Sequence, residues 1–130
     1  MRVLDTDVCV EILRKNRRVL DRRRETLDEA ATTWVTVAEL YYGAAKSAYP
    51  DVNRQAVSDF LRTVDILQMG QSAAEQFGAL KARLEREGRQ LADADLFIGA
   101  ICLTAGAVLV TGNKRHYERI DGMSMEDWIR

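Results

Sequence analysis

"RVLDTDVCVEIL", residues 2–13, places a short apolar run, two acids and a second apolar run in direct succession. The first run is typical of a buried strand. The second has helical spacing, with Val8, Ile12 and Leu13 on one face. Asp5 therefore stands where the strand ends and the helix begins. An acid at that point caps the helix, or it contributes to a site if other acids converge on it.

The same alternation of strand and helix continues along the chain, without an internal repeat. Strands are predicted at 2–5, 32–36, 64–69 and 107–111, with an edge strand in the tail "MSMEDWI", residues 123–129. Helices are predicted at 6–15, 17–30, 37–47, 51–63, 71–87 and 93–106. Alternating strands and helices predict a mainly parallel sheet covered on both faces. We therefore expect one three-layer α/β/α domain over residues 1–130.

Composition agrees with a folded domain of this kind. Of the 130 residues, 47% are hydrophobic and only one is proline, so the chain is long and apolar enough to bury a core. Nineteen basic residues nearly balance twenty acidic ones, so net charge does not indicate a nucleic-acid-binding protein. Local charge can still do so. One segment is strongly basic and forms either a solvated face or a phosphate-binding surface: Arg14, Lys15, Arg17, Arg18, Arg22, Arg23 and Arg24.

Other features of the sequence bear on the cellular location of the protein and on the kinds of catalytic site it can contain. No apolar run approaches the roughly 20 residues of a membrane span, and no signal-peptide pattern opens the chain. Cys9 and Cys102 lie among apolar neighbours, which is typical of reduced, packed thiols in a cytoplasmic protein. His116 is the single histidine. It excludes a mechanism that needs two histidines and argues against a zinc site.

Acids recur where the predicted strands end. Parallel strands end at one edge of the sheet, so we expect these side chains to share a pocket. Like charges are unfavourable together unless a cation neutralises them. Oxygen ligands point to Mg²⁺ or Mn²⁺, and the chemistry expected of such a site is metal-assisted hydrolysis of a phosphodiester. The candidate residues are Asp5, Glu39 in the first turn of the helix 37–47, Asp95 and the neighbouring Asp93, and Asn113 directly after the last predicted strand.

Each acid also has a purely structural interpretation. Asp5 is a possible N-cap, and Thr36-x-x-Glu39 matches a capping box. Asp93 is another possible N-cap, and Asp95 suits the positive end of the same helix. Taken together they favour a site, because the helix after Asp95 is apolar enough to be buried and carries that acid inward. Two further residues are expected to have structural roles: Asp7 faces solvent or supports the cap, and His116 lies in a loop.

Five segments resemble the PIN-domain family, and more closely the VapC-type toxins of bacterial type II toxin–antitoxin modules. The resemblance covers the chain from end to end in the same order and spacing, which is far more specific than any one motif. The segments are "LDTD" at 4–7, "VTVAELYYGAAKS" at 35–47, "LADADLFIGAICL" at 91–103, "LVTGNKRHYERIDGM" at 109–123 and "EDW" at 126–128.

The resemblance implies a Mg²⁺- or Mn²⁺-dependent endoribonuclease held inactive by a cognate antitoxin, acting on RNA and usually a homodimer. It implies that Asp5, Glu39 and Asp95 hold the metal, with Asn113 orienting water or a metal-bound ligand. Thr6 and Thr111 are expected to support these groups from behind.

The chain departs from the family pattern at two positions. His116 stands where many relatives carry a fourth acid, and Asp7 stands where Asn is common. Either Asp93 or Asp7 supplies the missing negative charge, or water completes the metal shell instead. Two alternatives therefore stay open: a PIN-type RNA-processing nuclease outside a toxin module, and a catalytically weak module that binds RNA or an antitoxin.

Overall fold

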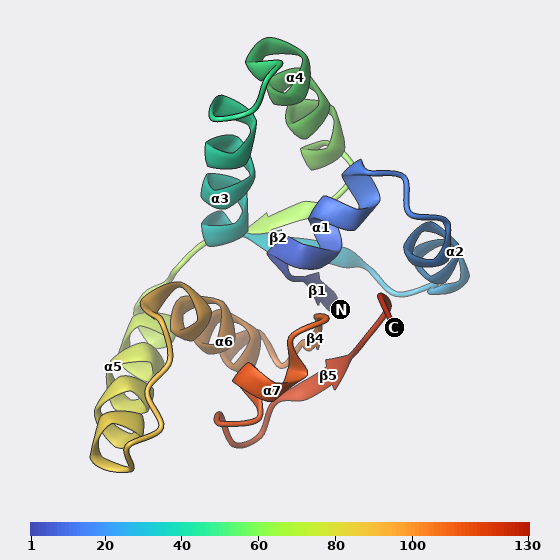
Figure 1. Cartoon of the computed structure of the whole chain (residues 1–130). Helices are drawn as coiled ribbons and strands as arrows, with labels where there is room; N and C mark the ends of the chain where they lie inside the picture. Colours follow the sequence, from blue (N-terminus) through green and yellow to red (C-terminus); the bar gives the residue numbers. More distant parts are fainter.

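The computed structural model describes all residues, 1–130, and contains one five-stranded sheet (Figure 1). The strand order is β3-β2-β1-β4-β5, and every neighbouring pair is parallel. This confirms the predicted parallel sheet and places β1 at its centre. The strands are β1 (Arg2–Leu4), β2 (Ala30–Thr33), β3 (Asp65–Leu67), β4 (Val108–Val110) and β5 (Ser124–Glu126).

Helices connect the strands and cover the sheet. Figure 1 shows α1 to α4 in the upper half of the molecule and α5 to α7 in the lower half. None of them is long and apolar enough to cross a bilayer. The helices are α1 (Thr6–Leu13), α2 (Arg17–Glu25), α3 (Trp34–Ala45), α4 (Pro50–Leu61), α5 (Gln71–Arg86), α6 (Asp93–Ala105) and α7 (Lys114–Tyr117).

Two apolar clusters, one on each face of the sheet, make this a three-layer fold. Neighbouring strand residues point to opposite faces. Val3 thus packs in the cluster that holds residues of α5 and α6, whereas Leu4 packs with residues of α1, α2, α3 and α4. Cys9 and Cys102 are buried and unpaired, one in each cluster. Burial raises the pKa of each thiol to about 12, so both are packing residues.

Two predicted boundaries were wrong, and one of the errors concerns the site. The helix predicted at 17–30 ends at Glu25, and the strand predicted at 32–36 runs from Ala30 to Thr33. Ala30 pairs in register with Arg2 of β1, and the hydroxyl of Thr33 accepts a hydrogen bond from the backbone N–H of Thr36. Because of this cap, α3 begins at Trp34, before the predicted start at residue 37. Glu39 consequently lies in the second turn of α3, not the first.

Candidate active site

Asp5 is the buried centre of the site, at the end of the central strand. Only 7% of the residue is exposed. Its Oδ1 accepts a hydrogen bond from the backbone N–H of Thr6 at 2.8 Å, and its Oδ2 accepts one from the hydroxyl of Thr111 at 2.8 Å. Asp5 is also the N-cap of α1, so the predicted cap and the predicted site residue are the same side chain.

Burial makes the Asp5 carboxylate costly to ionise. Desolvation raises its pKa to about 6, against the hydrogen bond from Thr111, which lowers it. The negative charges of Asp7 and Asp95 raise it further. A group of this kind is stabilised by a nearby cation.

Asp95 lies in the first turn of α6, is held by Tyr117 of α7 and lies near His116 of the same helix. The hydroxyl of Tyr117 donates to Asp95 Oδ1 at 3.3 Å, and His116 Nδ1 lies 3.5 Å from Asp95 Oδ2. Tyr117 is fully buried. Desolvation, together with the charges of Asp5 and Asp95, raises its pKa, so the phenol stays protonated and acts as a donor.

Asn113 is connected to Asp5 through its backbone. Its N–H donates to the hydroxyl of Thr111 at 2.9 Å, and that hydroxyl donates in turn to Asp5. The side-chain Nδ2 of Asn113 lies 2.8 Å from His116 Nδ1. His116 therefore lies beside two candidate site residues. The prediction that it lies in a loop was wrong, because it belongs to α7.

Glu39 reaches the site through two threonines. The hydroxyl of Thr6 donates to Glu39 Oε1 at 2.7 Å and lies 2.9 Å from the hydroxyl of Thr36. Since Thr6 has one hydroxyl proton, Thr36 donates to Thr6. The capping-box interpretation of Glu39 was wrong, because Thr33 is the N-cap of α3 and Glu39 bonds to Thr6 instead.

Asp7 lies in the first turn of α1 and faces the loop before Asn113, so the first of its two predicted roles, facing solvent, was wrong. Its Oδ2 accepts from the backbone N–H of Gly112 at 2.9 Å, and its Oδ1 is buried without a partner. Burial raises the pKa of this carboxyl. A Cβ at Gly112 would lie 2.8 Å from Asp7 Oδ2 and 2.8 Å from Ile129 Cδ1, so glycine permits this close approach of the loop before Asn113.

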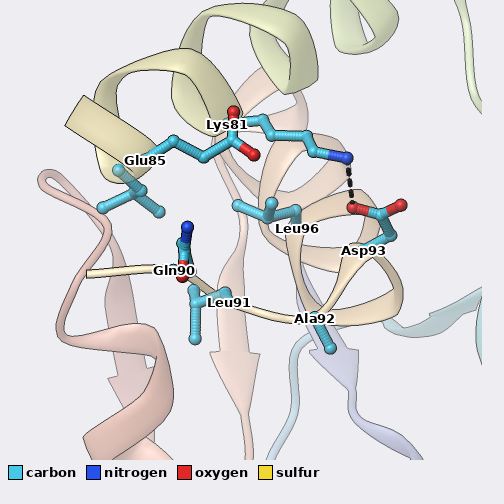
Figure 2. A pocket seen from close by; sticks show the side chains of 8 residues that line it. Lys81, Glu85, Gln90, Leu91, Ala92, Asp93 and Leu96 are labelled. Carbon is cyan, nitrogen blue, oxygen red and sulfur yellow. Dashed lines mark ion pairs between the residues drawn. The ribbon is translucent and has the colours of Figure 1, made fainter. Parts of the chain in front are cut away.

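The side chain of Asp93 points toward α5 and not toward Asp5. Its Oδ1 lies 2.9 Å from Nζ of Lys81 on α5, and Figure 2 shows this ion pair at a pocket of about 300 Å³. Leu84, Leu91 and Leu96 also line the pocket, whereas Asp95 does not. Asp93 is also not the predicted N-cap of α6, because Ala92 occupies that position.

The structure thus brings Asp5, Asp95 and Asn113 together, with Glu39 beside them through Thr6. No three His, Cys, Asp or Glu side chains lie close enough to one another to form a ready-made metal site. Sequence reasoning did not find the Tyr117 hydroxyl or the buried Thr36. The only sequence signal for Tyr117 was its helical spacing to the apolar Ile120.

Comparison with known proteins fixes the family. The sequence pattern of the PIN domain matches residues 2–123. Ribonuclease VapC2 of Haemophilus influenzae is 34% identical, over 98% of this chain and 97% of its own length. The chain belongs to the VapC family of PIN domains. The tRNA(fMet)-specific endonuclease VapC of Shigella flexneri is also 34% identical, over 97% of this chain and 96% of its own.

Solved VapC structures share the fold throughout. The crystal structure of DNA-bound VapBC from Salmonella typhimurium matches with a TM-score of 0.92 at 32% identity, covering 98% of this chain and 97% of that one. VapBC2 from Rickettsia felis, bound to a promoter DNA fragment, matches with a TM-score of 0.92 at 25% identity and 98% coverage of both chains. The VapC fold therefore extends over nearly the whole chain, including the segments that carry Asp5, Glu39, Asp95 and Asn113.

Proposed function

We propose that this VapC-family chain is a divalent-metal-dependent endoribonuclease and the toxin of a toxin–antitoxin module, acting as a single domain in the cytoplasm. The observation that carries the proposal is the pairing of Asp5 and Asp95 at the carboxyl edge of a PIN-domain sheet. Burial raises the pKa of the Asp5 carboxyl, and the negative charge of Asp95 raises it further. The relatives named as ribonucleases align over nearly the whole chain.

The residues present fit Mg²⁺ or Mn²⁺. Asp5 and Asp95 offer hard carboxylate oxygens, and Mg²⁺ usually takes one or two carboxylates and keeps several waters. A closed cage of three acids is therefore unnecessary. When bound, such an ion activates water and stabilises negative charge on the phosphoryl oxygens. Glu39 is the third proposed ligand, directly or through water.

The chain's own groups fix this arrangement before RNA binds. Thr111 and the Thr6 N–H hold the two oxygens of Asp5, and Tyr117 holds Asp95. The Thr36–Thr6 pair holds Glu39. The Asn113 amide lies at the exposed side of the site, where we propose that it orients water or a phosphate oxygen. Preorganised polar groups of this kind need little rearrangement during reaction.

Cleavage of total RNA tests the proposal, with Mg²⁺, Mn²⁺ and excess EDTA in parallel. Asp95→Asn should lower the rate about a thousandfold or more, because it removes one of the proposed carboxylate ligands of the metal. Asp93→Asn is the matched control two residues away, with its partner on α5, and should stay within a few-fold of the wild-type rate. Cleavage that survives EDTA, or equal losses in the two variants, would contradict the assignment.

An antitoxin segment is the proposed occupant of a groove between α1, α3 and α4. The groove holds about 420 Å³, is lined by apolar residues that include Val10, Leu40 and Val57, and has Glu39 among its polar residues. Tyr42 and Tyr49 are exposed by 66% and 72%. Tyr42 lies on α3 beside the half-buried Tyr41, and Tyr49 directly precedes α4. Buried aromatic side chains contribute strongly to interfaces. A basic antitoxin side chain at Glu39 would compete with the metal.

Replacing Ala56, an exposed groove residue on α4, tests this occupant. Ala56→Glu should weaken binding of the co-expressed antitoxin, because it introduces an unpaired charge into the interface. Ile66→Glu, on the edge strand β3, is the control. Antitoxin binding that is equally strong in both variants would contradict this location.

A further inference from the structure

The charges of this chain are divided very unevenly. Residues 14–24 hold seven of the nineteen basic residues and one of the twenty acidic ones, so this stretch carries +6 and the rest of the chain −7. RNA carries one negative charge per nucleotide, and its affinity for a protein depends mainly on cations near its phosphates. An acidic nuclease therefore needs a separate basic surface to hold a long RNA.

Four of these cations stand within five residues, where α1 turns into α2. We call this surface the basic corner: Arg14, Lys15, Arg17 and Arg18. All four are exposed, with Arg14 and Arg17 exposed by 71% and 88%. Lys15 and Arg18 make no ion pair, and the pairs of Arg14 and Arg17 are long, at 3.4 and 3.7 Å. Exposed pairs of this kind contribute little to stability, so these charges are free for a ligand.

The local structure indicates that the cations are not there to stabilise the fold. Lys15 ends α1 with φ 60°, in the left-handed region, where glycine is the favoured residue. Its N–H donates to Ile12 O, and the Asn16 N–H donates to Glu11 O, which is the hydrogen-bond pattern of a glycine-type helix end. Arg17 and Arg18 open α2 without an acid in its first turn, although the helix dipole favours acids there. Residues that oppose local preferences often serve function.

By contrast, Arg23 of the same basic stretch has a structural role. Its Nη2 donates to the carbonyl and the hydroxyl of Thr63, and its guanidinium lies over the ring of Phe60. Arg23 therefore ties α2 to the end of α4 and is not part of the basic corner.

The basic corner is within reach of an RNA strand engaged at the carboxylates. α1 begins beside Asp5 and ends at Leu13, directly before the corner. Its eight residues span about 12 Å at 1.5 Å per residue, which corresponds to roughly three or four phosphates of a helical strand. Figure 1 shows α1 leading from the central strand toward α2. We propose that the basic corner binds the phosphate backbone of the substrate RNA a few nucleotides from the cleaved bond.

This inference rests on the proposed ribonuclease function, and a binding experiment separates the two. The triple variant Lys15→Gln/Arg17→Gln/Arg18→Gln removes three charges from the corner. The control Arg54→Gln/Arg62→Gln/Arg86→Gln removes three exposed charges from α4 and α5. Both are made in the Asp95→Asn background, and binding to a fluorescent tRNA transcript is followed by anisotropy at several KCl concentrations.

The corner variant should bind tRNA about tenfold more weakly than the control at moderate salt. Its slope of log affinity against log salt should be shallower by about two, because two or three phosphate contacts are lost. The loss should be smaller on an RNA of about two nucleotides, which is too short to span both surfaces. Thermal melts verify that both variants are folded.

Equal RNA affinities and equal salt slopes in the two variants would overturn the proposal. A loss confined to a DNA duplex or to antitoxin binding would also overturn it and assign the corner to that partner. Because binding is measured without cleavage, the result stands even if the wild-type chain cleaves no RNA, an outcome that would contradict only the proposed function.

Discussion

The hydroxyl of Tyr117 donates a hydrogen bond to Oδ1 of Asp95 at 3.3 Å, from a side chain with no exposed surface. A buried phenol that faces a carboxylate orients it and stabilises its charge. The second oxygen of Asp95 lies toward His116. The short helix α7 therefore holds one oxygen of an acid that belongs to α6 and places an imidazole beside the other.

Replacing Tyr117 with phenylalanine isolates this single hydrogen bond. Tyr117→Phe keeps the ring and its packing, so the melting temperature should change little. The cleavage rate should fall roughly tenfold and Mn²⁺ affinity should weaken several-fold, as is typical when a group supporting a metal ligand is lost. Calorimetric Mn²⁺ titration measures the affinity independently of cleavage. Tyr49→Phe, on an exposed tyrosine, is the control, and identical Mn²⁺ affinities in the two variants would show that the Tyr117 hydroxyl is only a packing group.

The burial of Asp5 predicts how stability of the metal-free protein depends on pH. Its pKa rises from 3.8 to about 6 on folding, so the folded state binds its proton more tightly than the unfolded state does. The resulting stabilisation is complete below the unfolded pKa and is lost as pH rises through about 6. A shift of this size corresponds to about 2–3 kcal/mol.

Asp5→Asn should therefore raise the melting temperature of the metal-free protein at pH 7 and flatten its pH dependence between about 5 and 7. Thermal melts in EDTA across this range measure both effects, with Asp127→Asn as the control carboxylate. A wild-type protein that becomes steadily less stable from pH 7 to 5.5 would contradict the raised pKa of Asp5.

The sequence was sufficient to predict the layers of the fold and the position of Asp5 and Asp95 at one edge of the sheet, for a physical reason. Asp5 and Asp95 each adjoin an element so apolar that it must be buried, and parallel topology brings strand ends to one edge. The sequence could not show which way a side chain turns once several partners compete. Asp93 faces Lys81 of another helix, and Asp7 faces the Gly112 loop. These contacts join residues far apart in the chain.

The start of α3 illustrates a second limit. Thr32, Thr33 and Val35 favour a strand by local preference, yet the cap hydrogen bond from the Thr36 N–H to Thr33 starts a helix there. The choice depends on where β2 pairs with β1, which is a tertiary property. Consequently the prediction found Glu39 but assigned it the wrong helical turn and the wrong partner.

Lys15 offers a test of whether the basic corner opposes stability. Lys15→Gly should raise stability by up to about 1 kcal/mol, since it relieves a left-handed conformation that glycine adopts freely, while it weakens tRNA binding. Denaturant unfolding and anisotropy measure the two effects on the same protein. Lys46→Gly, at the end of α3 with φ −90°, is the control and should lower stability. A Lys15→Gly variant that is less stable than wild type would remove the argument from the strained backbone.

His116 is the position at which the chain leaves the family pattern, and its contacts predict a metal preference. Its Nδ1 lies 2.8 Å from Asn113 Nδ2 and 3.5 Å from Asp95 Oδ2, so an ion held by Asp95 would lie near the imidazole. Mn²⁺ accepts imidazole more readily than Mg²⁺ does. The wild-type protein should therefore be activated at lower Mn²⁺ than Mg²⁺ concentrations. His116→Asp should supply an oxygen ligand and lower the Mg²⁺ concentration needed for activation. His116→Ala should lose the Mn²⁺ preference while keeping some activity through Asp5, Glu39 and Asp95. Metal titrations of cleavage by the three proteins decide the matter: superimposable Mg²⁺ and Mn²⁺ curves would show that the ring contacts Asp95 without influencing the metal.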